Sequence, residues 1–290
     1  ADATVARWAR RASAGAGARL AAIRDRVFEL AAPKRHHVML DLRARTGLFT
    51  WEALRQVPEG GVYAAVCEAE PALATRLCET LGEQVAALPE TARPVVFGSP
   101  LLDLGPTLAR HAAGVRFDRV VGHNVFDGRA GRFASVAAVL ADRVAPRGRV
   151  VLAEAVPRRA QRLSDLAPVD GIDDDLANRW RAAEAPIYES SDDPLVCWDL
   201  DDLRDAFAAA GFDARVEPFT GYQAIEVPPA LFDRWWDGDG ERPGYAVRLG
   251  GGLPPDDVAT VRRLCRVAWG RRALRWSSTT ALLLAVRAEA

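Results

Sequence analysis

The stretch from Val38 to Glu68 constrains the fold of this 290-residue chain most strongly. It opens with an apolar run that ends at Asp41 and continues through a tight turn that ends in Gly47. A helical segment follows, and then a second apolar run that leads into Glu68. Strand, helix and strand in this order are typical of a βαβ unit, whose two parallel strands are connected by a crossover helix. Continuous apolar strands of this kind are usually buried on both faces of the sheet.

The alternation of strand and helix continues to about residue 156. We expect strands at residues 37–42, 62–67, 94–97, 117–121 and 150–153, and helices at residues 50–56, 71–81, 101–111 and 133–144. A Pro-Arg-Gly turn at residues 146–148 precedes the fifth strand. Alternation over this length predicts an α/β fold with a doubly wound, mostly parallel sheet and helices on both faces.

The two ends of the chain differ from this central pattern. Residues 1–34 are expected to be an N-terminal helical extension or lid, interrupted at Gly15-Ala16-Gly17 so that two helices form. Residues 35–290 are expected to be one domain, with helical elaborations at about 158–212 and 228–277 and late strands at 214–219 and 279–286. No linker separates these parts. The chain starts at Ala1 without a methionine, so we expect a piece of a longer protein or a processed one.

Composition excludes several classes of function. The formal net charge is −1, so nothing global indicates nucleic acid or an anionic membrane as a partner. No apolar run approaches the roughly 18 residues of a membrane-spanning helix. The four cysteines are scattered, without a Cys-x-x-Cys pair or a Cys/His cluster, so we expect reduced thiols, no metal site and a cytoplasmic location.

Polar residues gather where the expected strands end. Asp41, Glu68 and Glu154 end or follow strands, and His123 and Asn124 follow the fourth strand. The carboxyl ends of parallel strands form the edge at which open α/β sheets bind ligands. Glu68 is suited to accept hydrogen bonds from both hydroxyls of a ribose, which would disfavour a 2′-phosphate and therefore NADP. NAD is also disfavoured, because the Gly-x-Gly-x-x-Gly fingerprint is absent.

These motifs together resemble the class I S-adenosylmethionine-dependent methyltransferases over about residues 35–156. The segments that carry the resemblance are Asp41-Leu-Arg-Ala-Arg-Thr-Gly47, Glu68 after the second strand, Gly98-Ser-Pro-Leu-Leu-Asp103, Phe117–Asn124, and residues 140–151 with their Pro-Arg-Gly turn. The resemblance implies that Asp41, Gly47, Glu68, Ser99 and Asn124 bind S-adenosylmethionine. It also implies methyl transfer to an acceptor that the sequence does not identify.

A narrower resemblance concerns a methyltransferase-like domain found C-terminal to recombination-associated AAA ATPases in some bacteria. It rests on Gly47–Arg55, Val57–Tyr63, Glu154–Pro157, Gln161–Leu163 and Asp193–Trp198. It implies an AAA ATPase domain of DNA recombination or replication as a partner. The sequence contains no Gly-x-x-x-x-Gly-Lys-Ser/Thr phosphate-binding loop of its own. The alternative to an enzyme is therefore a degenerate, non-catalytic module that acts in protein interaction or regulation.

Arg43 and Arg45 decide between these alternatives, because they stand where the family has glycines in the turn. Glycine permits positive φ and close approach of a ligand, whereas arginine adds bulk and charge. Three arrangements remain open. The two side chains point to solvent and leave the pocket intact, or they bind the cofactor carboxylate or an anionic substrate, or they fill the pocket and prevent binding.

The candidate catalytic residues are His123, Asn124 and Glu154. Asn124 is suited to hold the reacting heteroatom of a substrate, and His123 is suited to act as a base. The alternative is that they cap a loop. In-line methyl transfer depends strongly on positioning, so a missing acid/base pair argues little against an enzyme. Asn124-Val-Phe126 differs from the Asn-Pro-Pro-Tyr motif of nucleic-acid amino-methyltransferases, so methylation of bases has no direct support.

Two further groups allow both a structural and a functional interpretation. Arg158, Arg159 and Arg162 either line a solvated surface or meet an acidic substrate or nucleic acid. The late aromatic residues either pack in the core or line an aromatic substrate pocket. These aromatic residues are Trp198, Trp235, Trp236, Trp269, Trp276, Tyr188 and Tyr222.

Overall fold

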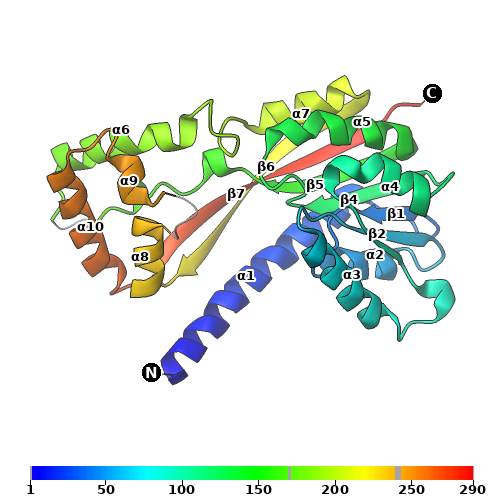
Figure 1. The fold of residues 1–290 in the computed structure, drawn as a ribbon, viewed down its shortest axis with the longest axis horizontal. Helices are drawn as coiled ribbons and strands as arrows, with labels where there is room; N and C mark the ends of the chain where they lie inside the picture. Colours follow the sequence, from blue (N-terminus) through cyan, green and yellow to red (C-terminus); the bar gives the residue numbers. More distant parts are fainter. Residues whose placement is uncertain (1, 169–170, 239–242, 290) are drawn as a thin grey trace. The chain divides into compact units, whose positions relative to one another are not determined.

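The computed structural model describes residues 2–168, 171–238 and 243–289. The chain clusters into two compact units (Figure 1). The first, here the sheet unit, contains Leu20–Val156, Trp198–Phe219 and Thr280–Ala290. The second, here the helical unit, contains Ala1–Arg19, Pro157–Cys197 and Thr220–Thr279. The limits between the units fall inside three continuous elements, which are helix α1 (Asp2–Ala31) and strands β6 (Phe212–Ile225) and β7 (Leu274–Arg287).

Seven strands of the described residues form one sheet in the order β3-β2-β1-β4-β5-β7-β6. The first five are β1 (Val38–Asp41), β2 (Gly61–Val66), β3 (Val95–Gly98), β4 (Phe117–His123) and β5 (Val144–Ala155). These five strands are parallel to their neighbours, whereas β7 is antiparallel to β5. The predicted doubly wound, mostly parallel α/β fold is therefore confirmed.

Helices connect these strands. Those of the sheet unit are α2 (Leu48–Gln56), α3 (Pro71–Val85), α4 (Leu104–His111), α5 (Phe133–Arg143) and α7 (Leu200–Ala209), together with the end of α1. Those of the helical unit are α6 (Asp174–Glu189), α8 (Pro229–Asp237), α9 (Tyr245–Leu249) and α10 (Pro255–Trp269). Short 3₁₀ turns lie at Glu90–Ala92, Leu101–Asp103, Ala130–Arg132, Pro157–Arg159 and Ser164–Leu166.

The central strands of the sheet are buried on both faces because they carry apolar residues at consecutive positions. Leu40 packs in the core cluster that contains residues of α4, α5 and α7, whereas its neighbour Met39 packs with α1 and α2. In β5, Val150 packs in the first of these clusters and Val151 packs in the second. Successive side chains of a strand point to opposite faces, so an uninterrupted apolar run supplies both cores at once.

The expected break in the N-terminal helix is wrong. Residues Asp2–Ala31 form one continuous helix, α1, which Figure 1 shows as a single ribbon. A glycine inside a helix costs only about 1 kcal/mol relative to alanine, and the surrounding residues are rich in alanine, the strongest helix former. The end of α1 is held by arginines of the sheet, because Arg149 donates to the Leu30 carbonyl at 2.8 Å and Arg119 donates to the Ala32 carbonyl at 3.3 Å.

The fifth strand also begins earlier than expected. It starts at Val144 and includes the Pro146–Gly148 segment, where its register against β4 shifts and Arg147 has a φ of 59°. Among the late tryptophans, Trp198, Trp236 and Trp269 are fully buried. Trp198 packs in the sheet unit, and Trp236 and Trp269 pack in the aromatic core of the helical unit, where the Phe232 and Trp236 rings stack at 5.3 Å. These three residues therefore serve packing.

Candidate functional site

The polar residues singled out in the sequence lie at one edge of the sheet unit. Asp41 ends β1, His123 ends β4, and Glu154 is the penultimate residue of β5. Glu68 follows β2 by two residues, and Ser99 directly follows β3. These strands are parallel, so all five residues lie where the carboxyl ends of the strands meet, which is the edge where such sheets bind ligands.

Asp41 is buried, and its side chain holds the turn between β1 and α2. One carboxylate oxygen accepts the backbone N–H of Arg43 at 3.1 Å, and the other accepts the hydroxyl of Thr50 at 2.8 Å. Burial raises the pKa of Asp41 to about 6, although both hydrogen bonds act in the opposite direction. Both side-chain oxygens of Asp41 therefore accept hydrogen bonds from the turn after β1 and from the first residues of α2.

Gly47 ends this turn and is the residue before α2. Its φ is +71°, in the left-handed region that side chains other than glycine rarely adopt. A Cβ at this position would lie 3.0 Å from Leu81 and 3.2 Å from Trp51. Both the backbone conformation and the close packing of these two neighbouring side chains therefore favour glycine at position 47.

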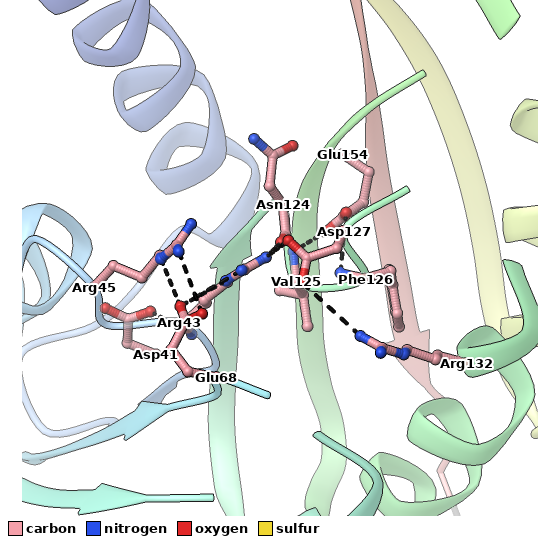
Figure 2. A network of polar contacts seen from close by, with 10 residues as sticks. All are labelled: Asp41, Arg43, Arg45, Glu68, Asn124, Val125, Phe126, Asp127, Arg132 and Glu154. Carbon is pink, nitrogen blue, oxygen red and sulfur yellow. Dashed lines mark hydrogen bonds and ion pairs between the residues drawn. The ribbon is translucent and has the colours of Figure 1, made fainter. Parts of the chain in front are cut away.

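Arg43 crosses the edge of the sheet from the β1 turn to the loop after β4 (Figure 2). Its side chain is only 2% exposed. The guanidinium lies 3.4 Å from the Glu68 carboxylate and 2.5 Å from Asp127, and it also donates to the Asn124 carbonyl. Burial lowers the pKa of Arg43, but Asp127 and then Glu68 raise it by more, so the side chain stays charged.

Arg45 approaches the same carboxylate from a more exposed position. Its Nε lies 2.5 Å from Oε1 of Glu68, and its Nη2 lies 3.2 Å from Oε2. The Glu68 side chain is 6% exposed, whereas that of Arg45 is 47% exposed. Glu68 is therefore enclosed between two guanidinium groups, one buried and one at the surface. We name Arg43, Arg45, Glu68 and Asp127 the arginine network.

The loop after β4 supplies the other half of this network. Asn124 and Asp127 have positive φ angles of 52° and 51°, which asparagine and aspartate adopt more readily than other residues. The Asn124 backbone N–H donates to the Ala153 carbonyl, and its side-chain oxygen accepts the Ala155 N–H, both at 2.8 Å. The side-chain oxygen of Asn124 therefore ties the loop to β5.

Glu154 also holds the loop after β4 in place. Its side chain is buried and accepts the backbone N–H groups of Val125 at 2.6 Å and Phe126 at 3.3 Å (Figure 2). Burial raises the pKa of Glu154 to about 8, although both hydrogen bonds and the Arg43 charge act to lower it. A carboxyl group with a strongly raised pKa is thus hydrogen-bonded to the loop that carries Asp127.

The raised pKa makes folding depend on pH. In the unfolded chain Glu154 titrates near 4.5, so its contribution to stability is fully present below that pH and is lost as the pH rises toward 8. We expect the free energy of unfolding to fall by up to about 1.4 kcal/mol per pH unit between pH 6.5 and 8. Asp41, with a pKa of about 6, adds a loss of the same sign at lower pH.

Urea denaturation of wild type and of Glu154→Gln across this range tests the assignment. The variant should be less stable than wild type at pH 5.5, by about 1 kcal/mol, because its amide nitrogen cannot accept the Phe126 N–H. It should also show a much flatter pH dependence. Parallel curves for the two proteins between pH 6.5 and 8 would contradict the assignment of this titration to Glu154.

Ser99 and His123 lie beside the network. Ser99 is buried, with its hydroxyl 2.9 Å from the Pro100 carbonyl and 3.0 Å from the Thr107 hydroxyl. The His123 ring is half-buried, with its centroid 6.2 Å from that of Phe49. A cavity of about 370 Å³ adjoins Glu68 and is lined by α3 residues and by Gly98, Ser99 and Pro100.

The sequence did not identify three residues of the site. Asp127 pairs with Arg43 and has a second partner in Arg132, whose guanidinium lies 3.9 Å from its carboxylate. Thr50 donates to Asp41. A weak signal was present, because an acidic residue in the β4 loop is the natural partner of an arginine in the β1 turn. Across the described ranges no three His, Cys, Asp or Glu side chains gather as a metal site would require. No helix within those ranges combines the length and apolar character needed to cross a membrane.

No protein-family model and no curated protein matches the sequence. Among solved structures, a candidate methyltransferase from Bacillus halodurans C-125 is 12% identical, covers 91% of this chain and 98% of its own, and has a TM-score of 0.51. A cyclopropane-fatty-acyl-phospholipid synthase-like protein from Lactobacillus casei is 18% identical, with coverages of 91% and 89% and a TM-score of 0.49.

Precorrin-6y C5,15-methyltransferase from Geobacter metallireducens is 12% identical, with coverages of 91% and 88% and a TM-score of 0.45. Identities this low bear on the fold alone, and of the three structures only the Bacillus halodurans protein reaches a TM-score above 0.5. Its match covers 91% of this chain, which has a seven-stranded, mostly parallel sheet with helices around it. The chain therefore has the Rossmann-like α/β fold of methyltransferases.

Proposed function

We propose that this chain is a non-catalytic methyltransferase-fold module, in which the arginine network takes the place of S-adenosylmethionine. The observation that carries the proposal is the buried Arg43 side chain, which spans from Glu68 after β2 to Asp127 after β4. Its path crosses the ends of β1 and β4, where the strand order reverses and where open α/β folds place their ligands. The residues present therefore do not fit the cofactor.

Energetics favour the state in which the arginine network occupies the cofactor site. A ligand that used Glu68 for its ribose would have to remove Arg43 from a buried ion pair and leave charged groups without their partners. Breaking one partner of a buried pair costs about 3–5 kcal/mol. That penalty weakens binding by a factor of roughly 10² to 5 × 10³, so micromolar affinity becomes roughly millimolar. Arg45 adds a second guanidinium that competes for the same carboxylate.

The role that remains for such a module is protein interaction or regulation. The partner we propose is an AAA ATPase of DNA recombination or replication. Support for this partner comes from the sequence resemblance at residues 47–55, 57–63, 154–157, 161–163 and 193–198. The proposal of a closed pocket does not depend on it, because the arginine network is a property of the sheet unit itself.

Calorimetric titration of the purified protein with S-adenosylmethionine and S-adenosylhomocysteine tests the proposal. We expect no saturable heat and no shift of the melting temperature at micromolar ligand, because the network has to open before either ligand can bind and the remaining affinity is roughly millimolar. Micromolar binding of both compounds would overturn the proposal.

That result would instead support the activity implied by the sequence resemblance, a methyltransferase with an unknown acceptor. The cavity beside Glu68, Gly98 and Ser99 is the observation that favours this second candidate, because it leaves space next to the carboxylate expected to hold a ribose. Its catalytic candidates remain His123, Asn124 and Glu154.

A further inference from the structure

The helical unit contains a larger cavity that none of the functional residues discussed so far touches. Its volume is about 930 Å³, at the upper end of the range for small-molecule sites. The residues directly after β6, helix α8, and the end of α10 with the turn that follows it form its walls. The apolar part of the lining is contributed by Val227, Pro229, Ala230, Leu231, Trp269 and Ala273.

The floor of this cavity is fixed in place by the core beneath it. Val227 and Trp269 are buried members of the core of the helical unit. The indole N–H of Trp269 donates to the Leu166 carbonyl at 2.9 Å, so its polar atom is already satisfied. Phe232 packs edge-on against the same indole, with 5.9 Å between ring centroids. A rigid, apolar floor favours the apolar body of a ligand over water, which needs polar partners.

Three arginines surround this floor. Arg234 comes from α8, and Arg271 and Arg272 come from the turn after α10. All three are exposed, and none has a side-chain hydrogen bond, ion pair or ring contact with a described residue. Glu226, the acidic residue of the described lining, already has an interaction of its own. The rim therefore carries three arginine side chains that no described residue pairs with.

Neighbouring arginines show that this arrangement is not general in the helical unit. Arg262 and Arg266 of α10 pair with Asp233 and Asp237 of α8 at distances of 2.6–2.7 Å. Acidic residues of α8 thus pair with arginines of α10, whereas the three arginines at the cavity have no acidic partner among the described residues. Charge without a protein partner, placed around an apolar cavity, is the pattern expected of a site for an anionic ligand.

We infer that this cavity binds an amphiphilic anion, a carboxylate or phosphate headgroup attached to an apolar body. The headgroup is held by Arg271, Arg272 and Arg234, and the body lies on the floor beside Trp269. Guanidinium groups hold both headgroups by paired, charge-assisted hydrogen bonds. The site is independent of the arginine network, because every residue that lines it belongs to the helical unit.

Calorimetric titration of the full chain with decanoate, decyl phosphate and decanol, each below its aggregation limit, tests the inference. We expect one saturable site for each charged compound, and decanol should bind at least about tenfold more weakly because it forms no charge-assisted hydrogen bonds. Acetate and inorganic phosphate should not saturate the site at millimolar concentration, because they lack the apolar body.

Variants separate the two halves of the site. Arg271→Glu combined with Arg272→Glu should weaken decyl phosphate binding by at least about tenfold, since the rim charge is reversed. Ala230→Trp should also weaken it, because the indole fills the cavity and leaves the charges in place. Arg263→Glu is the matched control, since Arg263 is exposed on α10 and lies outside the lining. Unchanged melting temperatures establish that each variant is folded.

Several results would overturn the inference. These are no saturable binding of either charged compound, equal binding of decanol and decanoate, and equal losses from Arg263→Glu and from the double variant. Cosedimentation with anionic phospholipid vesicles, without binding of the monomeric compounds, would assign the arginines to a membrane surface instead. Binding that survives Ala230→Trp would show charge attraction without use of the cavity.

Discussion

Replacing Arg43 with alanine is expected to lower the free energy of unfolding by about 3–5 kcal/mol. Arg43 is the buried partner of Glu68, and removing one member of a buried pair leaves an uncompensated charge. The value should fall toward the lower end, because Arg45 still contacts Glu68 and Asp127 is 47% exposed and becomes hydrated. Urea denaturation at pH 7, monitored by circular dichroism, measures this difference.

Arg45→Ala is the matched control. Its side chain is 47% exposed, and an exposed ion pair contributes at most about 1 kcal/mol. Both variants remove a guanidinium from the same carboxylate, so their difference reports the burial of Arg43 together with its contacts to Asp127 and the Asn124 carbonyl. A loss of less than 1 kcal/mol for Arg43→Ala would show that the network does not stabilise the sheet unit as the geometry indicates.

The second large effect is a gain of binding. Arg43→Gly combined with Arg45→Gly should increase the affinity for S-adenosylhomocysteine by at least about 100-fold over wild type, because a penalty of roughly 3 kcal/mol is removed. The ribose hydroxyls can then pair with Glu68 in place of the guanidinium groups. Saturating ligand should raise the melting temperature of the double variant and leave that of wild type unchanged.

Arg45→Gly alone provides the control, because Arg43 remains across the edge and no binding should appear. Circular dichroism establishes that the double variant is folded. A folded double variant that still shows no binding at millimolar ligand would mean that closure of the site depends on more than the two arginines.

The fold was predictable because its signal is local. The strands from β1 to β5 each contain a short apolar run, and turn residues such as Gly47 and Gly211 mark the ends of the connections. Parallel strands necessarily bring their carboxyl ends together, so the positions of Asp41, Glu68 and Glu154 followed from the strand assignments alone.

The directions of the side chains were not predictable in the same way. Whether Arg43 points to solvent or across the sheet depends on the approach of the loop at Asn124–Asp127, whose positive φ angles bring Asp127 within 2.5 Å of the guanidinium. Nothing in the spacing of Arg43 and Asp127, 84 residues apart, indicates this contact. The sequence also gave no sign of two units. Their limits lie inside α1, β6 and β7, so no linker marks them.

That continuity has a consequence for inheritance. The helical unit is built from three separate stretches of the gene, and the last of them is followed by the codons for Thr280–Arg287, the part of β7 that pairs with β5. A stop codon anywhere before Thr280 therefore removes this strand as well, and leaves β5 with an unpaired edge that invites aggregation. Neither unit can therefore be removed by simple truncation, or exchanged by joining genes at a spacer, without cutting α1, β6 or β7.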